Sequence, residues 1–364
     1  MVPEPRGPIF IVGPMGSGTT LMRLILDSHQ DIAIAQETGF ARALLANEWI
    51  PFYQFGGEWY GRLGMTQDEL EKELGDFYGG LFARFAKDQG ASRWGDKTPF
   101  HTWHIPLLAR VFPDAVFVAT ARHPAAVAAS IHRRMRYPWE RAIRHWVKAS
   151  AEMVYQGSQL GDRFILCRYE DLVTDPEPLL RQLLDRLGET WSDRLLDFHE
   201  VHASRGTAAE VEGHTRSDEP LDAGRVAAWT TTLTPERRAR LQRRAAATLT
   251  ALLGYQLDQP LPRRPLGDGA DGGLLLNGDD LARLVSTHPG IRWNKLPKPA
   301  LENRPLLRAD LQRLRSNAAH GGPRRSLLAE RVGRQTGHLA RRAFRRLPPN
   351  GRRRIRYLLE LGRR

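Results

Sequence analysis

The sequence predicts an α/β fold of the P-loop type, in which a parallel sheet is flanked by helices. Short apolar runs alternate along the chain with segments of helical periodicity, the pattern of strands that are joined by crossover helices. The first apolar run, at residues 8–12, leads directly into a glycine-rich turn. With 364 residues, of which 41% are hydrophobic and 26% charged, the chain has the composition of a globular protein, which excludes collagen-like, mucin-like and wholly disordered proteins.

The expected elements follow one another in alternating order. After the strand at 8–12, the apolar residues Leu21, Leu24 and Ile25 recur at helical spacing. Thr66 and Glu69 have the spacing of a capping box, which marks the start of the first long helix. Six aromatic residues between positions 49 and 60 are expected to form a packed loop. Further strands are expected at 32–35, 115–120 and 163–168, and helices at 66–88, 124–134, 139–160, 176–187 and 234–254.

The positive charge of the chain is concentrated toward its C-terminus. Residues 261–364 hold 24 basic and eight acidic residues, whereas the part before them is slightly acidic, so no nucleic-acid binding is expected. We expect a first domain at 1–257, a linker rich in Pro, Gly and Asp at 258–273, and a basic, mainly helical extension at 274–364. The extension fits either a helix on an anionic membrane surface or a solvated or partner-docked tail.

The sequence also leads us to expect a cytoplasmic protein. Its N-terminus lacks the basic start, apolar run and cleavage site of a secretory signal, and no apolar stretch approaches the ~20 residues of a membrane-spanning helix. The single cysteine, Cys167, lies in an apolar run and cannot form an internal disulfide, which fits a reducing compartment.

A glycine-rich loop between the first strand and the first helix is a candidate anion site. Residues 13–20 read Gly-Pro-Met-Gly-Ser-Gly-Thr-Thr, and backbone N–H groups at such a helix start point toward a bound anion. The Gly-x4-Gly spacing is that of a nucleotide triphosphatase loop, but Thr19 stands where that motif requires lysine. An ATP or GTP hydrolase is therefore disfavoured, and a P-loop kinase is kept only as an alternative.

Four sequence motifs, which follow one another along the chain, add to what the glycine-rich loop indicates. Pro-x-x-Ser-Gly-Thr-Thr-Leu begins at residue 14, Gly-Asp-Lys-Thr-Pro occupies 95–99, Arg122-His-Pro precedes Ser130 by eight positions, and Tyr169 opens Tyr-Glu-Asp-Leu. Over about residues 8–255 the chain thus resembles the sulfotransferases that use 3′-phosphoadenosine 5′-phosphosulfate (PAPS). It is most similar to the tyrosylprotein sulfotransferases and their bacterial relatives.

The resemblance implies a set of roles without a metal ion. The loop would hold the 5′-phosphosulfate, Arg122 and Ser130 the 3′-phosphate, and Tyr169 the adenine, while Arg225 adds charge near the 3′-phosphate. The loop positions that match the family are Gly16, Ser17, Gly18, Thr19 and Thr20. The product would be 3′-phosphoadenosine 5′-phosphate (PAP).

Catalysis needs a base for the acceptor hydroxyl and a cation for the developing charge. Glu37 matches the family's catalytic carboxylate and Lys97 the lysine that reaches toward the sulfuryl group; His101 is an alternative base. The implied acceptor is a hydroxyl of a small molecule, a glycan or a peptide tyrosine. Gly16 departs from the family, whose members mostly carry Lys or Arg there. A weakly active or noncatalytic PAP-binding relative therefore stays open.

Overall fold

The computed structural model describes residues 6–41, 43, 44, 59–205, 219–262 and 274–287, and these residues all belong to one compact unit. Most of the aromatic-rich run at 49–60 and the basic chain beyond residue 287 lie outside the described residues, so the expectations for both stay predictions. No helix among the described residues is both long and apolar enough to span a membrane.

A six-stranded sheet forms the centre of the unit, in the order β2-β3-β1-β4-β5-β6. The first five strands are parallel and β6 is antiparallel to β5, which confirms the predicted mainly parallel sheet. The strands are β1 (Ile9–Val12), β2 (Ile32–Gln36), β3 (Arg93–Lys97), β4 (Val116–Ala121), β5 (Phe164–Arg168) and β6 (Leu275–Asn277).

The sequence did not predict β3, because its residues are not apolar. Arg93, Asp96 and Lys97 are nevertheless buried there, between β1 and β2. Gly95 permits the close pairing with β1, since a Cβ atom at this position would lie 2.4 Å from the Ile9 carbonyl oxygen. A strand that buries charged groups has no hydrophobic pattern by which it can be recognised.

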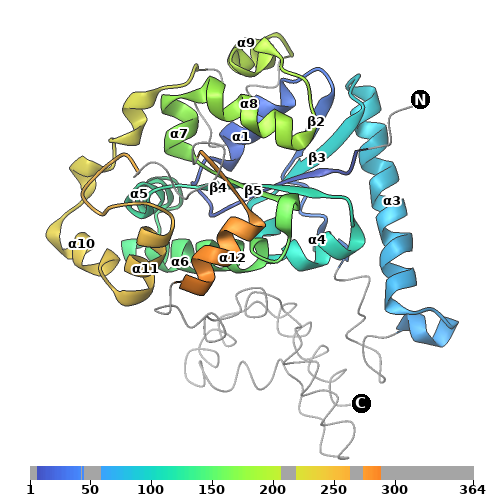
Figure 1. Ribbon diagram of the computed structural model, residues 1–364, viewed down its shortest axis with the longest axis horizontal. Helices are drawn as coiled ribbons and strands as arrows, with labels where there is room; N and C mark the ends of the chain where they lie inside the picture. The colour runs from blue at the N-terminus through green and yellow to red at the C-terminus, as the bar shows by residue number, and fades with distance from the viewer. Residues whose placement is uncertain (1–5, 42, 45–58, 206–218, 263–273, 288–364) are drawn as a thin grey trace, which may run out of the picture. The chain divides into compact units, whose positions relative to one another are not determined.

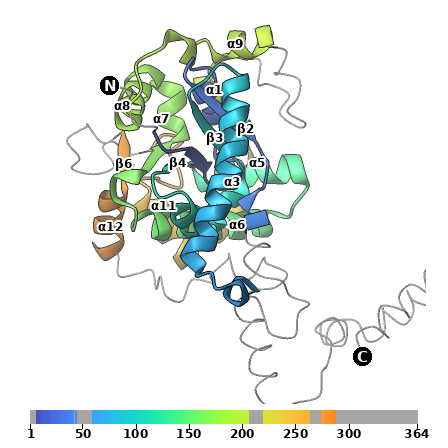
Figure 2. The ribbon, with the colours of Figure 1, turned by 90° about the vertical axis from the view of Figure 1, so that its right-hand side faces the viewer.

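Helices cover both faces of the sheet (Figures 1 and 2). Ile9 and Ile11 of β1 pack toward one layer, and Phe10 and Val12 toward the other, as the alternation of a strand requires. The first layer contains α1 (Thr19–Asp27), α8 (Pro176–Leu187) and α9 (Phe198–Arg205). The second contains α3 (Gln67–Asp88), α4 (Ile105–Val111), α5 (Pro124–Met135), α6 (Trp139–Gly157), α11 (Arg244–Leu252) and α12 (Gly278–Thr287). The short helix α7 (Tyr169–Thr174) follows β5 directly.

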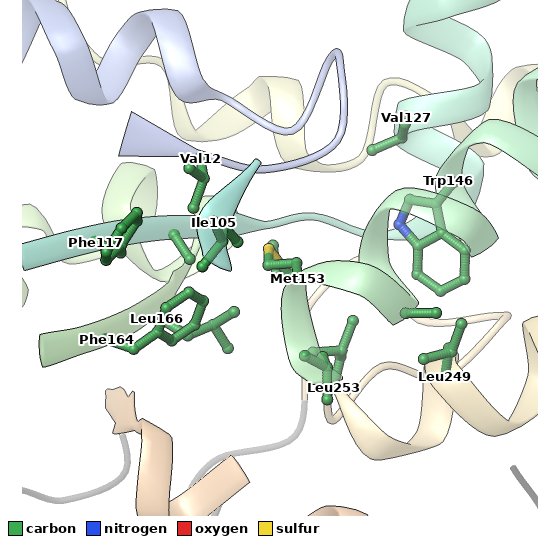
Figure 3. Close-up of a cluster of buried hydrophobic side chains, with 14 of the residues drawn as sticks. Val12, Ile105, Phe117, Val127, Trp146, Met153, Phe164, Leu166, Leu249 and Leu253 are labelled. Carbon is green, nitrogen blue, oxygen red and sulfur yellow. The ribbon is translucent and has the colours of Figure 1, made fainter. Parts of the chain in front are cut away.

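Trp146 of α6 is the largest side chain buried in the second layer (Figure 3). Its indole Nε1 donates a hydrogen bond of 3.1 Å to the carbonyl of Arg122, the residue that follows β4. This side chain therefore both fills the core and holds the carboxyl end of β4, where Arg122 begins the functional part of the fold.

Two expectations about the C-terminal part of the domain need correction. The helix expected at 234–254 is two helices, α10 (Pro235–Leu241) and α11, because the backbone of Arg243 is extended and starts the second one. The domain also does not end at residue 257, since β6 pairs with β5 and α12 packs in the second layer. The sheet domain therefore continues to Thr287, and only the part beyond it remains a candidate extension.

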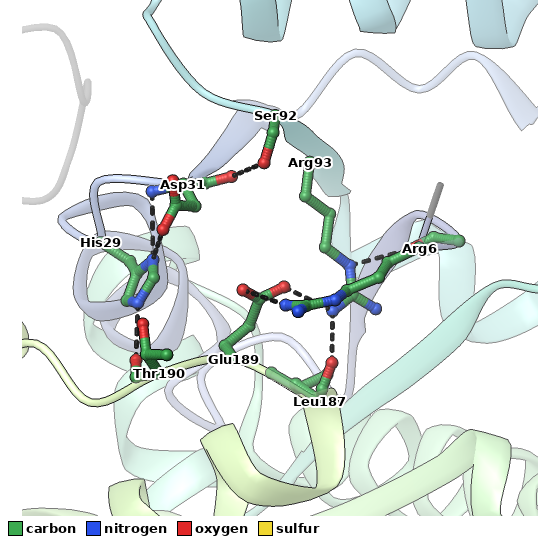
Figure 4. A network of polar contacts seen from close by, with 9 residues as sticks. Arg6, His29, Asp31, Ser92, Arg93, Leu187, Glu189 and Thr190 are labelled. Carbon is green, nitrogen blue, oxygen red and sulfur yellow. Dashed lines mark hydrogen bonds and ion pairs between the residues drawn. The ribbon is translucent and has the colours of Figure 1, made fainter. Parts of the chain in front are cut away.

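A buried polar network ties the start of the chain to β3 and to the end of α8 (Figure 4). The guanidinium of Arg93 donates to the carbonyl groups of Gly7 (2.8 Å) and Leu187 (2.7 Å) and pairs with Glu189 at 3.0 Å. Arg6 pairs with the other carboxylate oxygen of Glu189 at 2.6 Å. Both oxygens of Glu189, which lies near His29 and Asp31, are thus already in contact with arginines.

Glu189→Gln is expected to destabilise the protein by roughly 2–4 kcal/mol, because it leaves the buried Arg93 guanidinium without a counter-charge. The free energy of unfolding in urea measures the loss. Asp76→Asn is the control, since it removes a solvent-exposed pair with Lys72 and should leave that free energy almost unchanged. If the two substitutions changed the free energy of unfolding equally, burial of the Arg93–Glu189 pair would not contribute to its effect on stability.

Candidate active site

The glycine-rich loop joins β1 to α1 and is tethered at its base. The N–H of Gly13 donates to the Thr102 hydroxyl (2.8 Å), and the N–H of Met15 donates to Nε2 of His145 (3.2 Å). Gly18 occupies the N-cap of α1 in the left-handed conformation, with φ of 104°, and has no side chain that caps the helix. The first N–H groups of α1 are therefore left to bind an anion above the loop.

The hydroxyl groups of the loop have different surroundings. The Ser17 hydroxyl is buried and shares a hydrogen bond of 2.9 Å with Thr120 of β4, so this side chain ties the loop to the sheet. Thr19 is also buried. The Thr20 hydroxyl accepts a hydrogen bond of 3.2 Å from Nζ of Lys97. Ser17 and Thr19 therefore stabilise the loop, whereas Thr20 connects it to the lysine.

Arg122 and Tyr169 lie against one side of the loop. The Arg122 guanidinium lies 3.7 Å from the centre of the Tyr169 ring and donates to the Gly16 carbonyl at 3.3 Å. A Cβ atom at Gly18 would lie 2.6 Å from the Tyr169 ring, so the absence of a side chain lets the ring approach. One at Gly16 would lie 3.2 Å from the Ser130 hydroxyl. The structure thus brings together five of the predicted residues.

Arg134 joins this group, although the sequence analysis did not select it. It follows Ser130 by four residues on α5, and its Nη2 atom lies 3.4 Å from the Cβ position of Gly16. Burial and then the positive charges of Arg133 and Arg122 lower the pKa of Arg134. The i, i+4 spacing from Ser130 is the signal that would have found it.

Arg122 and Arg134 form no ion pair with any carboxylate among the described residues. The Nε atom of Arg122 is moreover buried without a hydrogen-bond partner in that part of the chain. Two neighbouring guanidinium groups repel each other unless an anion lies between them. Beside an open helix N-terminus, these groups are suited to bind a ligand with several negative charges.

Arg225 is in a different electrostatic situation. It lies in a short 3₁₀ helix (Ala223–Val226), and its guanidinium pairs with the carboxylates of Glu219 and Asp222. Val226 beside it packs in one cluster with Tyr169. The charge of Arg225 is thus already balanced, and its contact with a cofactor stays a prediction.

Glu37 and Lys97 meet on the other side of the loop. Their strands are paired so that Gln36 lies opposite Lys97, which places Glu37 just beyond the lysine. Nζ of Lys97 lies 2.5 Å from Oε1 of Glu37. The lysine is fully buried, whereas the Glu37 side chain is 48% exposed. Burial lowers the pKa of Lys97, and the Glu37 carboxylate opposes that shift.

This geometry separates a possible base from a cation. The half-exposed carboxylate of Glu37 is accessible to an acceptor hydroxyl, while the ammonium group of Lys97 faces the loop through Thr20. His101, the alternative base, is fully buried with Nε2 2.6 Å from an Asp96 carboxylate oxygen. Glu37 is therefore the better placed of the two candidates.

The chain is similar to known proteins in both sequence and fold. The model of the sulfotransferase family matches residues 8–193, which is half of the chain. The chain belongs to the sulfotransferase family. Zebrafish (Danio rerio) protein-tyrosine sulfotransferase 1 is 28% identical to it over 234 residues, 61% of this chain and 65% of that protein. Chicken (Gallus gallus) protein-tyrosine sulfotransferase 2 is 30% identical over 210 residues, 54% of this chain and 55% of that protein. The chain thus spans less than two thirds of each of these relatives.

Solved structures support the same fold. The sulfotransferase domain from the curacin biosynthetic pathway has a TM-score of 0.52 and 20% identity, and the match covers 69% of this chain and 98% of that domain. The sulfotransferase domain of the Synechococcus PCC 7002 olefin synthase also has a TM-score of 0.52, with 22% identity. This match covers 70% of this chain and 98% of that domain. These likenesses concern the sulfotransferase fold alone.

Stability of this sulfotransferase-family chain is expected to fall as the pH decreases from about 6.5 to about 4. Burial lowers the pKa of His123 and of His145 from 6.5 to about 4. Between these values the unfolded chain binds more protons than the folded chain, which favours unfolding. Each histidine contributes on the order of 3 kcal/mol to the loss by pH 4.

Urea unfolding at several pH values of the wild type and of His145→Asn measures this dependence. Over this pH range wild type should lose more stability than the variant. Only in wild type does protonation at residue 145 disrupt the hydrogen bond that Nε2 of His145 accepts from the N–H of Met15. His132→Asn, at an exposed position of α5, should retain the wild-type dependence. A His145→Asn dependence identical to that of the wild type would contradict the assignment.

Proposed function

We propose that the chain transfers the sulfuryl group of PAPS to an acceptor hydroxyl and releases PAP. The observation that carries this proposal is the pair Arg122 and Arg134, which have no carboxylate partner among the described residues, beside Ser130 and the open loop. PAPS has two separate anionic groups, and this site has two separate sets of donors. Family membership and the match to relatives that are named protein-tyrosine sulfotransferases support the same reaction.

Each set of donors fits one anionic group of the nucleotide. The loop amides and the start of α1 would hold the 5′-phosphosulfate, which supplies the sulfuryl group when bound. Arg122, Ser130 and Arg134 would hold the 3′-phosphate through charge-assisted hydrogen bonds. Tyr169, which stacks on Arg122, would contact the adenine.

Glu37 and Lys97 would divide the chemical work. Glu37 would take the proton of the acceptor hydroxyl as the acceptor oxygen forms its bond to sulfur and the bond between sulfur and the departing phosphate oxygen of PAP breaks. Lys97 stabilises negative charge at the reacting centre, since its ammonium group already reaches the loop at Thr20. The contact between the two residues, at 2.5 Å, holds the carboxylate and the ammonium group side by side before the reaction begins.

Gly16 does not by itself favour the noncatalytic alternative. Its backbone has a φ of 85°, a conformation that residues with side chains rarely adopt, so a cation carried by the loop itself is disfavoured. Arg134 instead places a guanidinium beside this position from α5. The site thus keeps a positive charge next to the loop although the loop has none.

Several finer points stay proposals. The acceptor is a peptide tyrosine, a glycan or a small molecule, and the names of the relatives favour a phenolic hydroxyl. Cytoplasmic location and contact of the C-terminal tail with an anionic membrane or another partner follow from the sequence only.

PAP is expected to stabilise the protein against thermal unfolding by ~2.7 kcal/mol at one hundred times its dissociation constant, whereas AMP and ATP stabilise it less. Arg122→Gln should weaken PAP binding at least tenfold, since a charge-assisted contact is lost. Arg181→Gln, which removes a surface pair with Glu177 on α8, is the control. Stabilisation by ATP but not by PAP would instead favour the kinase.

Glu37→Gln is expected to lower turnover at least a hundredfold while PAP affinity is retained, because the base is removed but the anion site is not. Turnover is followed as PAP released from PAPS with 4-nitrophenol, a tyrosine peptide or a sugar as acceptor. If wild type binds PAP but no acceptor is sulfated in a Glu37-dependent manner, the noncatalytic alternative holds.

A further inference from the structure

The backbone of Glu37 has an unusual conformation. Its φ is 46°, and Arg136 is the one other non-glycine residue with positive φ among those described. A residue with a side chain avoids this region unless the surrounding structure holds it there, and such residues cluster at functional sites. Contacts on both sides of Glu37 hold this turn.

A single buried carboxylate, that of Asp96, lies under the turn. One of its oxygens accepts a hydrogen bond of 2.6 Å from the Thr38 hydroxyl, and the other accepts one of 2.7 Å from the Thr98 hydroxyl. The Thr98 oxygen in turn accepts the N–H of Gly39 at 3.2 Å. Both residues that follow Glu37 are thus connected to Asp96, directly or through one hydroxyl.

The turn is held at its other end by the sheet. The N–H of Glu37 donates to the carbonyl of Lys97 at 2.8 Å, continuing the pairing of β2 with β3. Glu37 lies between this hydrogen bond and the contacts of Thr38 with Asp96. With both neighbours held, its side chain is directed back toward Nζ of Lys97.

Asp96 is suited to this task because it stays ionised although it is buried. Burial by itself would raise its pKa, but His101 and the hydroxyls of Thr38 and Thr98 lower it below the usual value. The His101 ring is fixed by edge-on contacts with Phe10 and Phe40, with centroid distances of 5.9 Å and 5.3 Å. A permanent carboxylate is a strong acceptor for the Thr38 hydroxyl.

We propose that Asp96 is a positioning residue, which through the Thr38 hydroxyl holds Glu37 in its left-handed conformation and directs its carboxylate to Lys97. The catalytic consequence rests on the proposed function, but the positioning itself does not. Without the Thr38 hydroxyl, Glu37 relaxes toward the common conformations, and its contact with the lysine is weakened.

Thr38→Val is the most direct test, because valine has the shape of threonine and lacks the hydroxyl. Thr38 is exposed, so the substitution leaves the core intact. Asp96→Asn disturbs the buried contact with His101 and risks unfolding, so it serves only as a second variant. Thr38→Ser restores a hydroxyl, and Thr231→Val is a matched control at an exposed threonine of a surface 3₁₀ helix.

Titration of Lys97 reports the position of Glu37 without any acceptor or cofactor. The chain has few lysines, so NMR of protein labelled at the lysine side chains resolves them, and Lys97→Met identifies the resonance. These lysines are Lys72, Lys87, Lys97, Lys148, Lys295 and Lys298. Since the Glu37 carboxylate raises the pKa of Lys97 against the effect of burial, removing it by Glu37→Gln lowers that pKa.

Thr38→Val is expected to lower the pKa of Lys97 toward its value in Glu37→Gln. When Thr38→Val is combined with Glu37→Gln, the pKa of Lys97 should stay at the value of Glu37→Gln alone. Thr38→Ser and Thr231→Val should titrate as wild type. The proposal is overturned if Thr38→Val titrates as wild type, or if it shifts Lys97 equally in the Glu37→Gln background, since the hydroxyl would then act independently of Glu37.

Turnover gives a second readout. Thr38→Val should reduce kcat at least tenfold while PAP affinity stays within twofold of wild type. Added to Glu37→Gln, it should not lower kcat further. A parallel loss of PAP affinity and of turnover would indicate a general structural role and contradict positioning. If wild type fails to bind PAP, the proposed function is wrong, whereas the titration of Lys97 still decides the role of Asp96.

Discussion

The site depends on the partners of one buried ammonium group. Lys97 is fully buried at the end of β3, and burial favours the neutral amine. Glu37, directly after β2, opposes this effect, and Thr20 offers an oxygen from the first turn of α1. Because the sheet register sets Gln36 opposite Lys97, strand pairing itself brings the carboxylate to the lysine. The strained turn at Glu37 and the carboxylate of Asp96 beneath it complete this arrangement.

The position of the loop follows from the strand order. The sheet extends from β1 through β3 to β2 on one side, and through β4 to β5 on the other. A crevice at the carboxyl ends of parallel strands forms where the order reverses, and ligands bind there in open α/β sheets. The loop after β1 therefore has Lys97 on one flank and Arg122 on the other. Glu37 follows β2, Lys97 ends β3 and Arg122 follows β4, and these side chains come together only at this edge of the sheet.

The ion pairs of the arginines distinguish Arg122 and Arg134 from the buried arginines elsewhere in the fold. Arg93 and Arg168 are buried, and each has a carboxylate partner, Glu189 and Asp171 respectively. Such pairs stabilise a fold only when the charges are matched. Arg122, which is partly buried, and Arg134, which is exposed, have no such ion pair in the described part of the chain, so both guanidinium groups can contact the anionic ligand proposed above.

The sequence by itself determined the loop, the apolar strands and the motif residues, because each leaves a local pattern of glycines, alternating apolar residues or fixed spacing. It did not determine β3, whose charged residues are stabilised only by their partners in space. It also did not show that Arg134 stands beside Gly16, that Arg225 is already paired, or that β6 extends the sheet. Those features are contacts between residues far apart in the chain. The tertiary structure alone decided them, because burial and electrostatic pairing depend on distance in space and not on distance along the sequence.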